Sequence, residues 1–301
     1  MPLVSILIPA YKPEFFREAL QSALDQRYPN LEIIVADDSP DEQIGEMTKA
    51  IHDPRLRYVR NTPAKGPMWN YVGMVELARG DYLKYLNDDD LLHPDCVARM
   101  VEAFRVDGVA LATSYRALID AEGKPLADQT FNRPLFSQDM LIEGGSLATR
   151  LLLLRINVVG EPTCMLFRKE DAAWIRPHPF AFGGYGRERS GAADVGLALN
   201  LLSQGDAVYF GEPLSRVRIS PLQWSNTSDA RLWSLTTWRH FLWHAARLGL
   251  LERRSLGWRL KCRPLHDPGP WRRMLRMNWR IFAIQGNWLR GLLWKKLCGH
   301  A

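Results

Sequence analysis

The sequence predicts an α/β fold, with a mostly parallel sheet flanked by helices. Through roughly the first hundred residues, short apolar segments alternate with segments of helical periodicity. Strands that alternate with helices pair in parallel through right-handed crossovers. Acidic residues directly follow two of the apolar segments, at the strand ends where such sheets bind ligands. The pattern therefore predicts a ligand site along one edge of the sheet.

The first part of the chain supplies four strands and three helices. Apolar runs predict buried strands at residues 4–8, 31–36, 56–59 and 82–86. Apolar residues at helical spacing predict helices at residues 14–26, 41–51 and 68–78. Each helix lies between two strands, as parallel crossovers require.

After Asp107 the alternation fades. We expect strands at 109–119, 161–167 and 207–210, a hairpin turn at 120–124, an irregular loop at 131–145, and helices at 192–203, 231–251 and 271–297. Residues 262–271 contain three prolines and a glycine, which is typical of a break in the chain. We divide the chain into an α/β domain at 1–222, with halves 1–107 and 108–222, and a helical basic C-terminal extension at 223–301.

The positive charge is concentrated near the end of the chain. The chain has 39 Lys and Arg against 33 Asp and Glu, and residues 253–301 hold twelve of the basic residues, one acid and five of the eleven tryptophans. A basic, Trp-rich helix is typical of a segment that lies on an anionic membrane surface. The alternatives are packing on the rest of the chain or on a second copy, as in a homodimer. No nucleic-acid-binding motif is present, so we expect no nucleic-acid partner.

Other features favour a cytoplasmic protein. No apolar run reaches the roughly 18 residues of a spanning helix. The first apolar run is short and lacks a preceding basic region, so we expect no signal peptide. The four cysteines, Cys96, Cys164, Cys262 and Cys298, are far apart and form no CxxC pair. We therefore expect reduced thiols rather than a zinc site or disulfides.

Three acidic clusters are candidates for chemistry. They are Asp37-Asp38 after the second strand, Asp88-Asp89-Asp90 after the fourth, and Asp194 behind the glycine-rich segment 183–191. Adjacent carboxylates repel one another, and they become useful where a divalent cation lies between them and a phosphate. The alternative is that these aspartates cap helices and turns.

The segments around these clusters resemble glycosyltransferases of family 2, which have the GT-A fold of nucleotide-diphospho-sugar transferases. The resemblance covers roughly residues 3–220. It is carried by residues 4–11, 26–39, 78–90 and 193–202, with Gly66, Asn70 and Pro94. It implies a Rossmann-like nucleotide-binding half, a DxD-type motif in the acidic triplet, and a metal-dependent reaction that inverts the anomeric carbon.

The resemblance implies a donor site around the acidic residues. It places Asp89 on a Mn²⁺ or Mg²⁺ ion, Asp90 on the metal or in an orienting role, and Asp88 on the ribose; oxygen ligands suit these cations. The residues that it places near the base, ribose or diphosphate are Pro9, Ala10, Tyr11, Asp37, Asp38, Lys65, Gly66 and Asn70. For Lys65 the alternative is a solvated loop lysine.

Two positions near the expected donor site depart from the family pattern. Trp69 stands where many relatives carry Arg, and residues 216–220 lack the His of a common Arg-x-His step. Asp89 is thus left without an obvious second protein ligand for the metal. Arg218 is a candidate for neutralising the diphosphate, and the alternative is a plain surface arginine.

Asp194 is implied to be the general base, which takes a proton from the acceptor hydroxyl as that oxygen attacks the anomeric carbon. The alternative is an N-cap of the helix that follows. The acid that usually precedes this base is replaced by Ala193. Arg187, Glu188 and Arg189 are acceptor-binding candidates, and a solvated charge run is their alternative.

The sequence therefore predicts an inverting, metal-dependent glycosyltransferase that acts in the cytoplasm or on the inner face of the membrane. The expected donor is a UDP- or dTDP-sugar, and the expected acceptor is a surface glycan, a lipid-linked saccharide or a protein. One rival is an inactive nucleotide-sugar-binding or scaffold protein. A nucleotidyltransferase is a weaker rival, because residues 9–13 lack the glycine-rich basic loop typical of that class.

Overall fold

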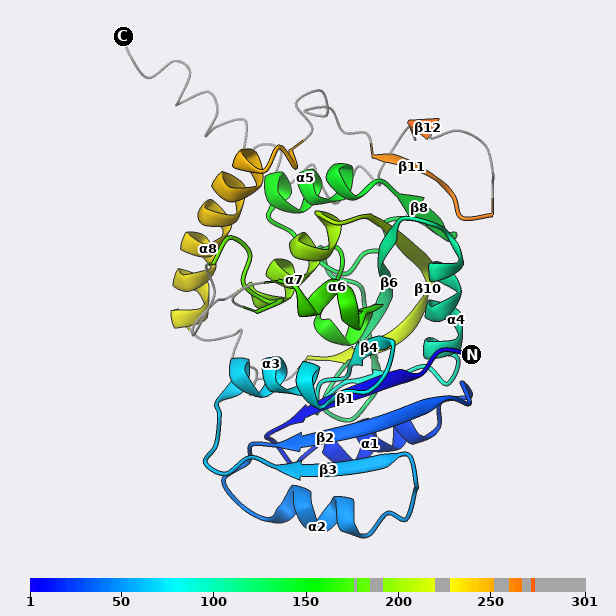
Figure 1. The fold of residues 1–301 in the computed structure, drawn as a ribbon, viewed down its shortest axis with the longest axis vertical. Helices are drawn as coiled ribbons and strands as arrows, with labels where there is room; N and C mark the ends of the chain where they lie inside the picture. The colour runs from blue at the N-terminus through cyan, green and yellow to red at the C-terminus, as the bar shows by residue number, and fades with distance from the viewer. Residues whose placement is uncertain (176–177, 185–191, 220–227, 252–259, 267–271, 274–301) are drawn as a thin grey trace.

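The computed structural model describes residues 1–175, 178–184, 192–219, 228–251, 260–266 and 272–273. This part of the chain forms a mixed twelve-stranded sheet with helices packed against it (Figure 1), which confirms the α/β prediction. The strands are β1 (Val4–Ala10), β2 (Leu31–Asp37), β3 (Leu56–Arg60), β4 (Tyr82–Tyr85), β5 (Leu91–Leu92), β6 (Val109–Ile119), β7 (Pro125–Leu126), β8 (Met140–Ile142), β9 (Met165–Arg168), β10 (Asp206–Arg218), β11 (Lys261–Pro264) and β12 (Arg272–Arg273). The α-helices are α1 (Phe16–Leu24), α2 (Gln43–Lys49), α3 (Pro67–Leu77), α4 (Cys96–Val101), α5 (Gly144–Leu154), α6 (Lys169–Ala173), α7 (Ala193–Leu202) and α8 (Ser228–Arg247), and two short 3₁₀ helices are η1 (Glu102–Arg105) and η2 (Pro162–Cys164).

The first four strands form a parallel block in the order β4-β1-β2-β3, as predicted. Alternate residues of β1 face two different cores because side chains alternate along a strand. Leu7 packs in the cluster that contains Met74 of α3, whereas Ile6 packs in the cluster that contains Phe16 of α1. Since the strands are parallel, the segments after β1, β2 and β4 meet at one edge of the sheet.

The second half of the sheet is mixed. β9 lies between β4 and β6 and is antiparallel to both, while β10 is parallel to β6 and antiparallel to β5 and β8. The parallel pairing predicted for most of the sheet therefore holds for the first four strands and for β6 with β10. β6 has the predicted bounds, and β7 completes the predicted hairpin by pairing with it.

Two elements of the second half differ from the sequence-based expectation. β10 runs over 13 residues rather than four, because register shifts near Pro213 let the strand continue past the proline. Its extension carries Arg218 to the loop after β4. The loop expected at 131–145 contains β8 and the start of α5, and β8 is buried. A three-residue strand gives too little alternation to be recognised from sequence.

The C-terminal region rejoins the sheet. After α8, which matches most of the helix expected at 231–251, β11 pairs with β8 and buries Leu260 and Cys262 in the larger core. β12 pairs with β11, and the rest of the helix expected at 271–297 lies outside the described residues. The domain division at 222 stays a prediction.

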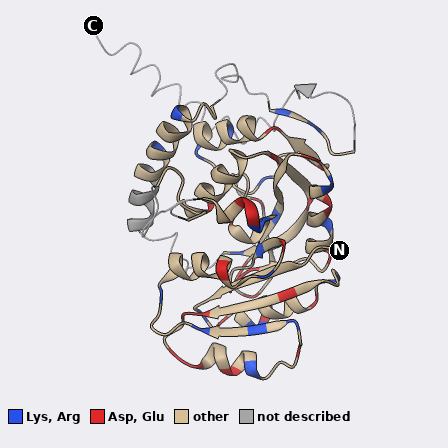
Figure 2. Ribbon diagram, viewed as in Figure 1, with Lys and Arg blue, Asp and Glu red and all other residues tan. Residues whose placement is uncertain are grey.

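Figure 2 shows acidic and basic residues interspersed along the described elements. None of the described helices combines the length and apolar character needed to cross a membrane. Cys96, Cys164 and Cys262 are buried free thiols, and Cys298 lies outside the described residues.

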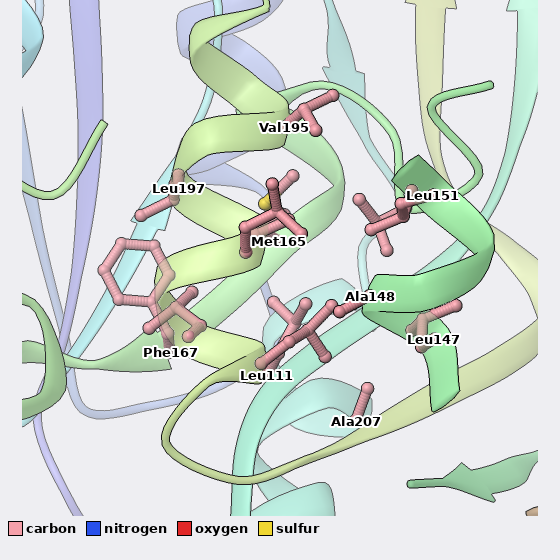
Figure 3. Packing of buried hydrophobic residues seen from close by; sticks show 14 of the residues in the cluster. Leu111, Leu147, Ala148, Leu151, Met165, Phe167, Val195, Leu197 and Ala207 are labelled. Carbon is pink, nitrogen blue, oxygen red and sulfur yellow. The ribbon is translucent and has the colours of Figure 1, made fainter. Parts of the chain in front are cut away.

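The larger core surrounds α7 (Figure 3). Leu147 and Leu151 of α5 and Met165 and Phe167 of β9 lie in the same buried cluster as Leu197 of α7. Residues 195–202 of α7 are all buried, as expected of a helix that is covered on all sides. Val195, the residue after Asp194 in the first turn of α7, belongs to this core.

Candidate active site

The first contact of the site joins the end of β1 to the loop after β4. Oδ2 of Asp88 accepts hydrogen bonds from the main-chain N–H groups of Tyr11 (2.7 Å) and Lys12 (2.8 Å). These two donors lower the pKa of Asp88 but do not fully offset burial, which raises it. The Tyr11 side chain is 54% exposed beside this junction, while Pro9 and Ala10 are buried in β1. The structure thus brings together Tyr11 and Asp88, which the sequence predicted to share a site.

Asp89 is the least satisfied member of the acidic triplet. Burial and the neighbouring Asp88 carboxylate raise its pKa, although Lys12 and Arg218 oppose that rise. Its own main-chain N–H also opposes the rise, and no side chain of the described residues donates a hydrogen bond to its carboxylate. A half-buried carboxylate with this environment fits a bound divalent cation, which would supply the missing positive charge. The described residues hold no group of three or more His, Cys, Asp or Glu that would complete a metal site.

Asp90 points into the protein. Its side chain is 1% exposed; Oδ2 accepts hydrogen bonds from Thr163 Oγ1 (2.7 Å) and Asn87 Nδ2 (3.0 Å), and Oδ1 accepts one from the main-chain N–H of Arg218 (3.0 Å). Both oxygens are therefore engaged by the protein. Of the two roles expected for Asp90, these contacts favour orienting the loop over binding the metal.

Arg218 is buried rather than a surface residue, so the surface alternative is wrong. Its Nε donates to the main-chain oxygen of Asp89, and its other guanidinium nitrogens bind the main-chain oxygens of Asp120 and Ala121 and the carboxylate of Glu18. The guanidinium also lies 4.3 Å from the ring centre of Phe15. These contacts fix the acidic loop, and the expected contact with a diphosphate stays a prediction.

The acidic pair after β2 is also held inside the fold. Asp37 is 0% exposed and accepts hydrogen bonds from Ser39 N, Tyr58 Oη and Arg60 Nη1. These donors outweigh desolvation, so the pKa of Asp37 is lowered. The contacts favour the turn-capping interpretation of Asp37 over direct contact with a nucleotide.

Asp38 organises the loop before α3. Its Oδ1 accepts hydrogen bonds from Asn61 Nδ2 (3.0 Å) and Lys65 N (2.7 Å), and its Oδ2 accepts one from Gly66 N (2.7 Å). Gly66 has φ = 80°, a left-handed conformation that favours glycine, and it caps α3. Asp38 is 5% exposed. Its carboxylate therefore shapes this edge of the sheet by fixing the loop before α3.

The other predicted donor residues line the same loop. Asn70 is buried in the first turns of α3 and donates to the main-chain oxygen of Ala36, which ties α3 to β2. The Lys65 side chain is exposed, with its ammonium beside Gly73 of α3. The structure thus assembles the loops after β1, β2 and β4 at one edge, as the crossover pattern predicted.

Asp194 lies inside the first turn of α7, whose N-cap is Ala192, so the N-cap alternative is wrong. Its carboxylate has two protein donors. Val195 N donates to Oδ1 (2.8 Å) and Asn157 Nδ2 donates to Oδ2 (2.5 Å). Burial, and next the charge of Glu161, raise the pKa of Asp194 to about 6, although these donors and Arg116 oppose the rise. A carboxylate with such a pKa is ionised at neutral pH and is still a useful proton acceptor.

Sequence reasoning missed several residues that support the site. Thr163 of η2 donates to Asp90 and accepts from Asn87 N, and Lys84 of β4 donates to the main-chain oxygen of Thr163. Asn157 holds Asp194 from the loop after α5. None of these residues forms a recognisable motif, because they act through contacts between distant segments. The predicted acceptor residues Arg187, Glu188 and Arg189 lie outside the described residues.

Comparison with known proteins identifies the family of this site. The profile of "Glycosyl transferase family 2" matches residues 5–173, which is more than half of the chain. An uncharacterized protein of Mycobacterium tuberculosis is 26% identical over 220 residues, covering 71% of this chain and 66% of that protein. Chondroitin synthase of Escherichia coli is 35% identical over 147 residues, covering 47% of this chain and 21% of that protein. The chain thus matches less than two thirds of the length of these curated relatives.

A third relative and two solved structures extend the comparison. UDP-Glc:alpha-D-GlcNAc-diphosphoundecaprenol beta-1,3-glucosyltransferase WfaP of E. coli is 35% identical over 91 residues, covering 30% of this chain and 36% of that protein. S. aureus TarS in complex with UDP-GlcNAc superposes with a TM-score of 0.57 at 14% identity, covering 75% of this chain and 61% of that chain. TarS in complex with UDP gives 0.55 at 14% identity, covering 85% and 74%. At this identity the structures show a shared fold.

Proposed function

The chain belongs to glycosyl transferase family 2, and from that premise we propose that it transfers a sugar from a nucleoside diphosphate sugar to a hydroxyl acceptor with inversion at the anomeric carbon. The observation that carries the proposal is the acidic loop. The Asp88 carboxylate joins this loop to the main chain of Tyr11 and Lys12, while no side chain of the described residues donates a hydrogen bond to the Asp89 carboxylate beside it. A loop built in this way leaves one carboxylate available for a cation and a diphosphate.

In the proposed reaction, the acceptor oxygen forms a bond to the anomeric carbon as the bond from that carbon to the diphosphate oxygen breaks. Asp194 takes the acceptor's hydroxyl proton, and the diphosphate leaves with the electron pair. Attack from the side opposite the leaving group inverts the carbon in one step. The core around α7 holds Asp194 in place, and Asn157 and Val195 orient its two oxygens.

The proposed cofactor is Mn²⁺ or Mg²⁺, held by Asp89. Bound there, the cation would stabilise the negative charge that develops on the leaving diphosphate. Contacts of Asp90 with Thr163 and Arg218 hold the acidic loop on its protein side. Asp89 would therefore keep its position as negative charge develops on the diphosphate. We assign the ribose contact to Asp88 and the base contact to the exposed ring of Tyr11.

The proposed donor is a UDP- or dTDP-sugar. The structural neighbours in complex with UDP-GlcNAc and UDP support a uridine nucleotide, because they share the fold of this chain. The proposed contacts on the diphosphate side come from the loop at Lys65 and Gly66, which Asp38 holds against the edge of the sheet. Removing the Asp38 carboxylate would therefore disorganise this side of the donor site.

The proposed acceptor is a growing surface glycan, a lipid-linked saccharide or a protein, with the reaction on the cytoplasmic side of the membrane. The similarity to WfaP, whose name describes a diphosphoundecaprenol-linked acceptor, supports a lipid-linked one. The basic, Trp-rich sequence at 271–301 supports contact with an anionic lipid surface. Full-length protein should sediment with anionic liposomes and protein lacking residues 271–301 should not; equal sedimentation of both would contradict the membrane proposal.

Product analysis tests the proposed reaction. Incubation with UDP- and dTDP-sugars, Mn²⁺ and a mixture of saccharide acceptors should release nucleoside diphosphate and give a product of inverted anomeric configuration by NMR. A product with retained configuration would contradict the mechanism. Tight binding of donor with no transfer to any acceptor would support the rival interpretation, an inactive nucleotide-sugar-binding protein.

A further inference from the structure

A buried ion pair lies beside the candidate base. Arg116 of β6 is 2% exposed, and its Nε lies 2.8 Å from Oε2 of Glu161. The same guanidinium donates through Nη2 to the main-chain oxygens of Phe131 and Asn157, both at 3.1 Å. Arg116 therefore links Glu161 to Asn157, the residue whose side chain holds Asp194.

The short loop between Asn157 and Glu161 fixes the position of this carboxylate. Asn157 and Gly160 exchange hydrogen bonds, with Nδ2 donating to the Gly160 oxygen (2.8 Å) and Gly160 N donating to Oδ1 (3.0 Å). Gly160 has φ = 89°, and a Cβ there would lie 2.6 Å from Sγ of Cys164. No larger residue fits that position. A chain of contacts thus runs from Glu161 through Arg116 and Asn157 to Asp194 and joins the two carboxylates, which come from different segments of the chain.

One oxygen of Glu161 remains available. Arg116 binds Oε2, whereas no described residue donates a hydrogen bond to Oε1, and the side chain is 28% exposed. Glu161 is also the charged group that most raises the pKa of Asp194, with Arg116 acting in the opposite direction. A nearby negative charge disfavours the ionised form of Asp194.

We propose that Glu161 and Asp194 form a carboxylate pair in the acceptor half of the site, with Asp194 taking the proton and Glu161 acting as its positioning partner. This inference rests on the proposed function, in which Asp194 is the base. The proton moves from the acceptor oxygen to Asp194, which becomes neutral and no longer repels Glu161. Glu161 thereby supplies, from the loop before η2, the second acid that Ala193 does not supply at the position before the base.

The pH profile of kcat/KM for sugar transfer tests the pair. Glu161→Gln should move the acidic limb to lower pH by roughly 0.5–1 unit, because removing a nearby negative charge makes Asp194 easier to ionise. Turnover at pH 8 should fall roughly 3-fold or more, because the base is weaker. Glu161→Asp keeps the charge and should leave the limb in place. Glu212→Gln is a matched control, because Glu212 also pairs with an arginine Nε, at 2.9 Å from Arg99, but on an exposed face. This variant should also leave the acidic limb in place.

The outcomes separate this inference from the proposed function. If Asp194→Asn loses turnover but Glu161→Gln leaves the acidic limb unchanged, the proposed carboxylate pair is wrong and the assignment of Asp194 as the base is kept. If Asp194→Asn keeps its turnover, the proposed base itself is wrong. Should Glu161→Gln fail to fold, the double variant Arg116→Met/Glu161→Gln removes both charges of the ion pair together. The acidic limb should again move to lower pH, because Glu161 acts on the pKa of Asp194 more strongly than Arg116 does. An unmoved limb in that folded double variant overturns the pair.

Discussion

The Nε of Arg218 donates a hydrogen bond of 2.9 Å to the main-chain oxygen of Asp89. The main-chain N–H of the same arginine donates to Asp90. The last residue of β10 thus contacts two of the three residues of the acidic triplet. The loop that we assign to the metal and the diphosphate is therefore shaped by a strand from the other half of the sheet.

Replacing Arg218 should destabilise the protein. Arg218→Lys leaves partly buried main-chain acceptors without donors, because an ammonium cannot reach all the groups that the guanidinium binds. We expect the free energy of unfolding to fall by about 2–4 kcal/mol. Arg216→Lys, on an exposed position of the same strand, should change it by less than ~0.5 kcal/mol. Urea denaturation measures both, and equal losses would contradict the role given to Arg218.

Removing the Asp89 carboxylate should remove the response to metal. With UDP present, Mn²⁺ should raise the Tm of the wild-type protein, because a ligand that binds the folded state stabilises it. Asp89→Asn keeps the size of the side chain and should lose this gain. Asp25→Asn changes an exposed acid at the end of α1 and should keep it. An equal gain in the Asp89 variant would show that the cation binds elsewhere.

Neutralising Asp194 should affect turnover rather than donor binding. Asp194→Asn can still accept the hydrogen bond from Val195 N but cannot take a proton, so kcat should fall by ~100-fold or more. The affinity for donor, measured by calorimetry, should be unchanged because Asp194 lies on the acceptor side in the proposed site. Unchanged kcat would instead leave Asp194 with only a structural role in the first turn of α7, through its hydrogen bonds with Val195 and Asn157.

The activity should depend on pH through Asp194. A base must be ionised, and the pKa of Asp194 is raised to about 6, so kcat/KM should be constant above that pH and decline below it. An ordinary aspartate would place the decline near pH 4. The measurement is a pH series at saturating Mn²⁺. A midpoint at the ordinary value would show that burial and Glu161 do not act on the base in solution.

The sequence predicted the fold of the first half well because its signals are local. The runs that became β1, β2 and β4 are apolar, and the acidic residues at the end of β2 and shortly after β4 mark the edge where sheets of this kind bind ligands. Parallel strands with helical crossovers then leave few topologies. The meeting of Tyr11, Asp38 and Asp88 at one edge followed from that topology alone.

The second half shows what the sequence could not predict. β10 continues through Pro213 by register shifts, and only this extension places Arg218 on the acidic triplet. Asn157, Thr163 and Glu161 act through pairings with residues far along the chain, which leave no periodic signal. The direction of the Asp37 carboxylate, toward Tyr58 and Arg60 rather than the sheet edge, likewise depends on the pairing of β2 with β3.

The most direct test of the central claim is a thermal-shift screen of UDP- and dTDP-sugars with and without Mn²⁺, because that claim is a metal-assisted nucleotide-sugar site at the acidic loop. At least one nucleotide sugar should raise the Tm, more strongly with Mn²⁺ than without it, and this difference should disappear in Asp89→Asn. A screen in which no nucleotide sugar changes the Tm of the wild-type protein, with or without the cation, would contradict the account.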